Sequence, residues 1–263
     1  MKVLCLIKFT PDVDSFVYDY ENNVLVRENV KLVLNPDDSC ALAYILKLKE
    51  RIKDIEVEVV TMAPLSVMSL VEDLLRRGVD RATIISDKAF VGSDTFVTST
   101  ILAEYIKKQQ FTCIFSGTHS LDGDTAHIPS QVAESLGINN MCNIIKIESE
   151  LTENSVKAKV DFEDEICTFD IGLPAVLGIK RESKYKLPYV KYKNIDLYVK
   201  DRIEIITNDE LMISKEKVGI EGSLTKVMKT YVKEFNNKEN IYVKNDDEGI
   251  EVVYQFLKEK GFV

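Results

Sequence analysis

From the N-terminus to about residue 147, short apolar runs alternate with amphipathic stretches. The runs are rich in β-favouring residues, which predicts strands at Val3–Ile7, Val57–Met62, Ala82–Ser86, Phe111–Phe115 and Asn143–Ile147. Between these runs, apolar residues recur every three or four positions, which is the spacing of one helix face. Strands that alternate with helices through short connections form a parallel sheet with right-handed crossovers. The pattern therefore predicts a doubly wound α/β fold with a mostly parallel sheet.

Two helix starts carry clear capping signals. Asn35-Pro36-Asp37-Asp38 ends a strand and starts a helix, because proline suits the first helical turn and aspartates favour the positive end of the helix dipole. Ala41 and Ile45 then begin the apolar stripe of that helix. Asp94-Thr95 is predicted to cap a later helix in the same way. These signals fix where two of the predicted strand-to-helix loops lie.

Antiparallel hairpins are predicted at two places. Near the N-terminus, Val24–Val26 and Lys31–Leu34 are expected to pair with each other. Beyond residue 150, Val156–Asp161 and Glu165–Ile171 alternate apolar with polar residues around the turn Phe162-Glu163-Asp164. The second hairpin is expected as an antiparallel addition to the mostly parallel fold.

The pattern of apolar and polar residues also changes in the last third of the chain. Leu173–Leu177 is one more buried strand, and Lys180–Lys193 is a basic, tyrosine-rich stretch that suits either a solvated loop or an exposed docking arm. A final amphipathic helix is predicted at about Glu248–Lys260. We expect a nucleotide-binding α/β domain at residues 1–220 and an extended C-terminal arm at residues 221–263, which packs on a partner subunit.

The stretch Phe111–Gly137 is the best candidate for a functional site. It reads as a buried strand, a loop of small residues and an amphipathic helix in immediate succession. The helix is predicted to begin at about Thr125, and its apolar stripe is Ile128, Val132 and Leu136. Loops at the carboxyl ends of strands are where open α/β sheets bind ligands.

The loop itself suits a phosphate-bearing ligand. Gly117 and Gly123 allow the backbone to approach a ligand closely, and the free N–H groups of the first helical turn attract phosphate. Asp122 or Asp124 is expected to cap the helix. Spacing alone fits two interpretations equally, a nucleotide site and an ordinary strand-to-helix turn with capping aspartates.

Composition excludes several classes of partner. Lys and Arg number 34 against 43 Asp and Glu, which gives a formal net charge of −9. Nucleic-acid binding needs a basic surface, so nucleic acid is not expected to be the main partner. No apolar run approaches the length of a membrane-spanning helix, and the first apolar run meets Lys8 without a signal-peptide cleavage site. We therefore expect a cytoplasmic protein without membrane insertion.

Metal binding and hydrolytic catalysis receive no support. The cysteines are scattered, without metal-ligand spacing, and are expected to be buried free thiols: Cys5, Cys40, Cys113, Cys142 and Cys167. The two histidines, His119 and His127, are too few for a zinc site, and Asp122-Gly123-Asp124 lacks the later ligands of a calcium loop. There is no P-loop and no legible Ser-His-Asp arrangement, so no catalytic residue is assigned.

The amino-acid sequence of this loop resembles that of a known family. Leu121-Asp122-Gly123-Asp124-Thr125, then Gln131, then Ala133-Glu134-Ser135-Leu136-Gly137 resembles the block with which the electron-transfer flavoprotein (ETF) β subunit wraps an adenine nucleotide. Other blocks resemble the family in the same order: Lys8 with Pro11-Asp12, Asn35-Pro36-Asp37-Asp38, Gly78-Val79-Asp80-Arg81-Ala82, Asp94-Thr95, Leu173-Pro174-Ala175-Val176 and Gly222-Ser223 with Thr225-Lys226-Val227. The chain departs from the family at Thr118-His119-Ser120, His127 and Pro129.

The resemblance implies a Rossmann-like β subunit of a heterodimer that carries electrons. The partner ETF α subunit would hold the electron-shuttling FAD, and this chain would bind either FAD or a structural AMP. Pro11-Asp12 and Asp94-Thr95 resemble family members with two flavins, which implies FAD here and electron bifurcation that oxidises NADH. Such a complex would exchange electrons with a dehydrogenase, for example one that acts on acyl-CoA or on a 2-hydroxy acid.

The resemblance also implies a set of cofactor-binding residues, each at or just beyond the carboxyl end of a predicted strand. The set is Leu6, Asn35, Asp37, Asp38, Met62, Asp94, Thr95, Thr98, Gly117, Asp122, Gly123, Asp124, Thr125, His127 and Gln131. Taken singly, each has a structural alternative as a cap or a core residue. The alternative function is a stand-alone adenine-nucleotide-binding regulatory module. A yellow complex with a larger chain would favour the electron carrier, and a colourless monomer would favour the regulator.

Overall fold

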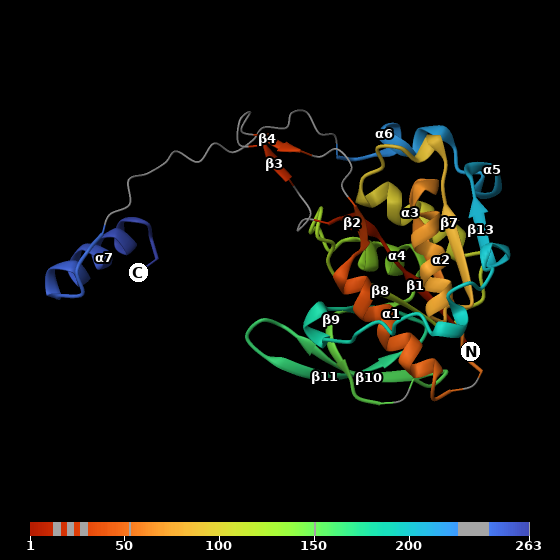
Figure 1. Cartoon of the computed structure of the whole chain (residues 1–263), viewed down its shortest axis with the longest axis horizontal. Coiled ribbons are helices and arrows are strands. Elements are labelled where there is room, and N and C mark those ends of the chain that lie inside the picture. Colours follow the sequence, from red (N-terminus) through yellow and green to blue (C-terminus); the bar gives the residue numbers. More distant parts are fainter. Residues whose placement is uncertain are drawn as a thin grey trace. The chain divides into compact units, whose positions relative to one another are not determined.

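The computed structural model describes residues 1–12, 17–19, 24–26, 31–52, 54–149, 151–225 and 242–262. The chain divides into two compact units, Met1–Lys226 and Val227–Val263. All the β-strands lie within the first unit, and Figure 1 shows its sheet with helices packed against it. None of the helices within the described ranges is long and apolar enough to cross a membrane.

The first unit is built on a sheet of nine strands, most of them parallel. Their spatial order is β11 (Ile166–Gly172), β10 (Ser155–Asp161), β9 (Asn139–Ile147), β12 (Ala175–Ile179), β8 (Cys113–Gly117), β1 (Lys2–Leu6), β6 (Glu56–Met62), β7 (Arg81–Ile85) and β13 (Ile203–Ile206). Only β10 pairs antiparallel with its neighbours, β9 and β11. The predicted α/β fold and the predicted β10–β11 hairpin are both confirmed.

Helices cover both faces of this sheet, as a doubly wound fold requires (Figure 1). The helices are α1 (Pro36–Lys49) and α2 (Met68–Arg77) on one face, and α3 (Thr95–Ile106) and α4 (Ile128–Leu136) on the other. Strand pleating divides the core between the faces, so Phe115 of β8 packs on the α1 side and Ile114 on the α3 and α4 side. Both side chains are fully buried.

The strand order reverses beside β1, and this reversal positions the site. From β1 the chain adds β6 and β7 on one side and then places β8 on the other. Strands β1, β6 and β8 run parallel, so their carboxyl ends lie at one edge of the sheet. The loops that leave β1 and β8 there lead toward opposite faces, which opens a crevice at the switch point.

The N-terminal hairpin differs from the prediction. Val24–Val26 (β4) pairs with β3 (Val17–Asp19), and Leu32–Leu34 (β5) pairs with β2 (Phe9–Pro11). The predicted pairing of Val24–Val26 with Lys31–Leu34 is therefore wrong. The sequence reason is that Asn22 and Asn23, residue types that turns favour, lie between the two strands that do pair. The predicted turn, residues 27–29, lies outside the described residues.

Two element boundaries near the central loop also shift. Strand β8 begins at Cys113, two positions later than predicted, and includes Gly117. Helix α4 begins at Ile128 rather than near Thr125, because Asp124 and Ala126 have positive φ angles of 47° and 53° that a right-handed helix cannot contain. The loop between strand and helix is therefore longer than the sequence pattern indicates.

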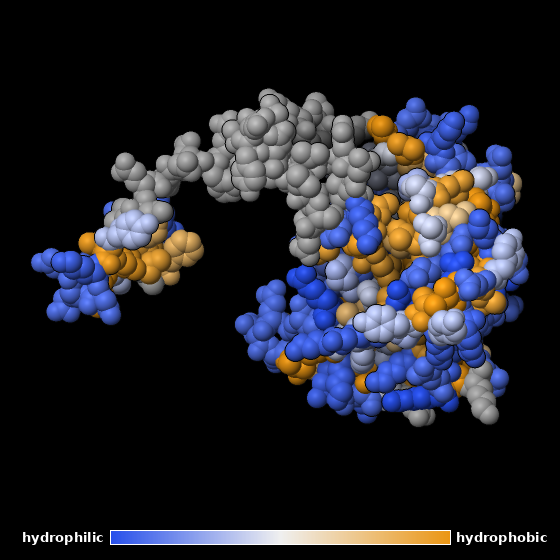
Figure 2. Space-filling model, viewed as in Figure 1, coloured by the Kyte–Doolittle hydropathy of each residue, from blue (hydrophilic) through white to orange (hydrophobic). Residues whose placement is uncertain are grey.

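The remaining elements are short, apart from the last helix. Short 3-10 turns lie at Leu65–Val67, Lys88–Phe90, Arg181–Ser183, Tyr192–Asn194, Lys200–Arg202 and Lys215–Lys217. Helices α5 (Asn208–Leu211) and α6 (Gly219–Gly222) complete the first unit, and Thr225 still donates to Asp94 of that unit. The second unit contains α7 (Asp247–Glu259), where Figure 2 shows hydrophobic residues gathered beside charged ones. The most exposed apolar side chains of α7 include Ile250 and Phe256.

Candidate functional site

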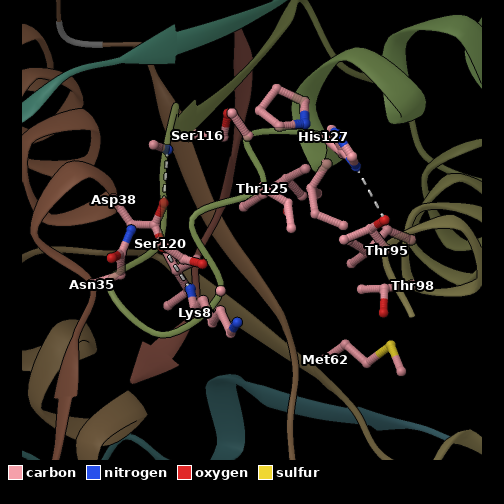
Figure 3. Close-up of a pocket in the computed structure, with 18 of the residues that line it drawn as sticks. Lys8, Asn35, Asp38, Met62, Thr95, Thr98, Ser116, Ser120, Thr125 and His127 are labelled. Atoms are coloured by element: carbon pink, nitrogen blue, oxygen red, sulfur yellow. Dashed lines mark hydrogen bonds between the residues drawn. The ribbon is translucent and has the colours of Figure 1, made fainter. Parts of the chain in front are cut away.

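A cavity of about 430 Å³ opens at the switch point, bounded by the carboxyl ends of β1, β6 and β8 and by the N-termini of α3 and α4 (Figure 3). Its volume lies in the range of small-molecule pockets. Most of the residues predicted from the sequence line it: Leu6, Asn35, Asp38, Met62, Asp94, Thr95, Thr98, Gly117, Gly123, Thr125 and His127. Four predicted residues do not: Asp37, Asp122, Asp124 and Gln131.

On the α1 side of the cavity, Asp38 holds two strand ends together. One of its carboxylate oxygens accepts a hydrogen bond from the N–H of Lys8 at 2.8 Å, just beyond β1, and the other accepts from the N–H of Gly117 at 2.7 Å, the last residue of β8. Burial raises the pKa of Asp38 to about 7, although these N–H groups act to lower it. Both oxygens are therefore used within the protein.

Asn35 and Asp37 hold the loop after β8 in the same way. The Asn35 side chain accepts from the N–H of Leu121 at 3.2 Å and donates to the carbonyl of His119 at 2.7 Å. Asp37 accepts from the N–H groups of His119 at 3.0 Å and Arg181 at 3.1 Å. Burial raises the pKa of Asp37, against the opposing effect of these two N–H groups. The polar residues at the start of α1 thus tie loops together.

An ion pair and a histidine–carboxylate hydrogen bond hold the outside of the same loop. Lys8 Nζ lies 2.7 Å from the Asp122 carboxylate, and His119 Nδ1 lies 2.8 Å from Asp124 Oδ1. Desolvation acts to raise the pKa of Asp122, but the hydrogen bond and charge of Lys8 hold it below its ordinary value. Asp124 lines a smaller neighbouring cavity of about 350 Å³, together with Asp37.

The prediction that Asp122 or Asp124 caps α4 is wrong. His127 occupies the N-cap position with φ −85° and ψ −32°, and no side chain of the described residues caps the first turn. Asp122 is instead engaged by Lys8, and the positive φ of Asp124 directs the chain away from a capping geometry. The uncapped N-terminus of α4 lines the cavity through His127 and Ile128, which leaves it available to an anion.

Helix α3 is capped as predicted. Asp94 accepts from the N–H of Val97 at 3.0 Å with one oxygen and from the N–H of Thr225 at 2.8 Å with the other. Desolvation acts to raise the pKa of Asp94, but these N–H groups hold it below its ordinary value. Thr95 Oγ1 lies 3.4 Å from His127 Nδ1, a long contact that links the two helix starts (Figure 3).

Several lining residues were not predicted from the sequence. Ser116 is the most informative, because its side chain is 3% exposed and its Oγ atom has no hydrogen-bond partner among the described residues. Phe90, Leu102 and Ile128 add apolar surface, and Lys8 contributes at the rim. Ser116 could have been found as the last side chain of a buried strand on the face that α3 and α4 cover. Gln131 Oε1 is also buried without a partner, but outside the cavity.

The described residues contain no cluster of His, Cys, Asp or Glu with the geometry of a metal site. The five cysteines are free thiols. Cys5 and Cys113 are buried completely in β1 and β8, and burial raises the pKa of both thiols. The cavity therefore offers backbone N–H groups, hydroxyls and apolar surface to a ligand.

Comparison with known proteins assigns the chain to a family. The model of the electron transfer flavoprotein domain matches residues 22–185. The chain is 31% identical over 264 residues to the electron transfer flavoprotein subunit beta of Thermoanaerobacterium thermosaccharolyticum, which covers 100% of both chains. The corresponding subunit of Clostridium acetobutylicum is 30% identical over 263 residues, again covering 100% of both.

A third relative belongs to a larger assembly. It is subunit CarD of the caffeyl-CoA reductase-Etf complex of Acetobacterium woodii, 31% identical over 236 residues, which are 88% of this chain and 87% of that protein. The full-length matches bear the name of the β subunit, and the family model covers more than half of the chain. The chain therefore belongs to the electron transfer flavoprotein family, among its β subunits.

Proposed function

We propose that this chain is the β subunit of a heterodimeric electron-transfer flavoprotein and that its cavity binds FAD. In this role it passes electrons between NADH, or a dehydrogenase, and other redox partners. The observation that carries the proposal is the cavity at the switch point, into which the uncapped start of α4 and the unpartnered Ser116 hydroxyl are directed. A phosphate-bearing ligand satisfies both features.

The residues around the cavity fit an adenine nucleotide. The start of α4 would hold phosphate oxygens, and the apolar side chains of Phe90, Leu102 and Met62 would contact a flat ring. Asn35 and Asp38 would act indirectly, by fixing the strand ends and the loop that enclose the ligand. When bound, FAD would supply the redox chemistry, and the protein would orient it and shield it from water.

Small residues favour FAD over AMP. Gly92, Ser93 and Thr98 line the cavity next to the start of α3, and their size leaves room for a group beyond the phosphates. The relative from Acetobacterium woodii is a subunit of a complex that contains a reductase of a CoA ester. By analogy, we propose that the partner enzyme here acts on an acyl-CoA or a 2-hydroxy acid, and that the complex carries out NADH-dependent electron bifurcation.

The partner subunit is proposed to be the ETF α subunit, held in part by the C-terminal arm. Helix α7 has an apolar side on which Ile250 is 59% and Val253 44% exposed within the described residues. Surfaces of this kind are typical of protein interfaces. Residues 242–262 would cover part of the α subunit.

The test is to co-express the chain with a candidate α subunit, purify the complex, denature it and quantify the released nucleotides by chromatography. Two FAD per heterodimer without AMP is the expected result. One FAD and one AMP would show a conventional carrier with structural AMP. A colourless chain that binds no α subunit but retains an adenine nucleotide would instead indicate the regulatory module. A chain without any nucleotide would contradict the proposal.

A further inference from the structure

Two buried hydroxyls near the carboxyl ends of the two parallel strands that flank β1 have no hydrogen-bond partner among the described residues. They are Ser116 of β8, which is 3% exposed, and Thr61 of β6, which is 1% exposed. A buried polar group without a partner lowers the stability of a fold, so each such group needs an explanation. The two hydroxyls differ in whether they line a cavity.

Strand pleating places these hydroxyls on opposite faces of the sheet. Ser116 follows Ile114 on the face that α3 and α4 cover, and Thr61 follows Val57 and Val59 on the face that α1 and α2 cover. Only Ser116 lines the cavity. Thr61 is therefore a natural control for what an unpartnered hydroxyl does when no ligand can reach it.

The cavity offers few charged hydrogen-bond donors to an anion. Among the described residues that line it, Lys8 is the only Lys or Arg, and its ammonium group is already paired with Asp122 at 2.7 Å. The carboxylates of Asp38 and Asp94 are occupied by backbone N–H groups. A phosphate here would be held by backbone N–H groups, hydroxyls and the imidazole N–H groups of His119 and His127.

Helix α4 alone provides an incomplete set of such donors. Its first turn contains Pro129, which has no N–H group and lines the cavity together with His127 and Ile128. A serine hydroxyl donates one hydrogen bond and turns freely to face its acceptor. Figure 3 draws Ser116, Thr125 and His127 around the same cavity. Ser116 thus provides a donor where the helix backbone lacks one.

We infer that the Ser116 hydroxyl donates a hydrogen bond to a phosphate group of the bound nucleotide, and so selects phosphate-bearing ligands. The inference rests on the proposed nucleotide site. It explains why a hydroxyl is kept at a buried position that offers it no protein partner. It also predicts that Ser116 contributes to binding and not to folding.

The test compares Ser116→Ala with the control Thr61→Val in the full-length chain, freed of bound nucleotide. Calorimetric titration with AMP, the part that FAD shares, and with adenosine measures affinity, and thermal unfolding without ligand measures stability. We expect Ser116→Ala to weaken AMP binding about tenfold or more, since the lost bond is to a charged group. Adenosine binding and the unliganded melting temperature should not fall. Thr61→Val should change neither affinity.

Three outcomes would overturn the inference. These are unchanged AMP affinity in Ser116→Ala, an equal loss for AMP and adenosine, or a lower melting temperature of the unliganded variant, which would reveal a structural partner. If the unsubstituted chain binds neither AMP nor adenosine, the proposed function itself fails, and the inference fails with it. Normal binding by the unsubstituted chain together with an unaffected Ser116→Ala variant would overturn the inference alone.

Discussion

The two sides of the cavity are built differently. On the α1 side, the side-chain oxygens of Asn35, Asp37 and Asp38 accept hydrogen bonds from backbone N–H groups that are distant in sequence. On the side of α3 and α4, one helix start has no side-chain cap and the Ser116 hydroxyl has no partner within the described part of the chain. The side richer in charge is therefore the scaffold, and the side with unused donors is the one suited to a ligand.

This difference shows how a polar signature can mislead. Three polar residues at the start of α1, Asn35, Asp37 and Asp38, suggest ligand contacts, yet their hydrogen bonds serve to join β1, β8 and the following loop. Substitutions on the α1 side should therefore lower stability or change its pH dependence. Substitutions on the α3 and α4 side should mainly change nucleotide affinity.

The largest expected effect is the pH dependence of Asp38→Asn. The pKa of Asp38 is raised to about 7 in the folded chain and is about 3.9 in an unfolded chain. As pH rises from about 4 to 7, the unfolded chain loses its proton first, so the wild type loses about 1.4 kcal/mol of stability per pH unit from this group. Asparagine does not titrate. Urea unfolding should show the variant gaining relative to the wild type across this window, by up to about 4 kcal/mol.

The control for this experiment is Asp122→Asn. The pKa of Asp122 is lowered, so its contribution is complete above the unfolded value and is lost only as pH falls through the folded value. Its difference from the wild type should stay constant between about pH 5 and 7. An Asp38→Asn difference that is equally constant would contradict the raised pKa of Asp38.

The next effect is that of Gly117→Ala, which tests how tightly β8 meets α1. A Cβ atom at Gly117 would lie 2.6 Å from the Cβ of Asp37 and 2.7 Å from the backbone nitrogen of Asp38, closer than atoms can pack. We expect a loss of about 3 kcal/mol in the free energy of unfolding, measured with urea. Gly123→Ala is the matched control, because its nearest neighbour would be Ser120 Oγ at 3.8 Å. Equal stability of the two variants would contradict the tight packing.

A smaller effect is expected for Lys8→Met, which removes the ion pair with Asp122. The two side chains are 49% and 34% exposed, so solvent screens the pair and the loss should stay below about 1 kcal/mol. The difference between variant and wild type should shrink further in high salt. A loss of several kcal/mol that salt does not change would show that the loop depends on this pair.

The smallest stability effect is expected for His127→Ala on the open side. The His127 side chain is exposed, and its contact with Thr95 is long at 3.4 Å. The free energy of unfolding should therefore change by less than about 0.5 kcal/mol. The affinity for AMP should fall, since His127 lines the cavity. A large loss of stability with unchanged affinity would reverse the distinction between the two sides.

Much of the fold could be predicted from local patterns. The apolar runs and helical stripes gave the strands β1, β6, β7 and β8 and the intervening helices, because periodicity depends on neighbours in sequence. The N-terminal hairpin was mispaired, because the short strands β4 and β5 match several partners equally well in composition. The pattern also placed the candidate site at the carboxyl ends of the strands, where the cavity lies.

The detail of the site could not be predicted in the same way. Asp122 meets Lys8 across 114 positions of sequence, and Asp37 meets Arg181 across 144, so their roles depend on the tertiary arrangement. A capping aspartate and a paired aspartate look identical in sequence. Ser116 gives no spacing signal, because its role follows from the face on which a buried strand ends.

Amide hydrogen exchange with and without AMP tests the contrast between the two sides most directly. If the α3 and α4 side binds the nucleotide, AMP should slow exchange at the N–H groups of Ile128 and Ser130 in the first turn of α4. The N–H groups of Lys8 and Gly117, already bonded to Asp38, should exchange at unchanged rates. Slowing confined to Lys8 and Gly117, with no change in α4, would contradict the account.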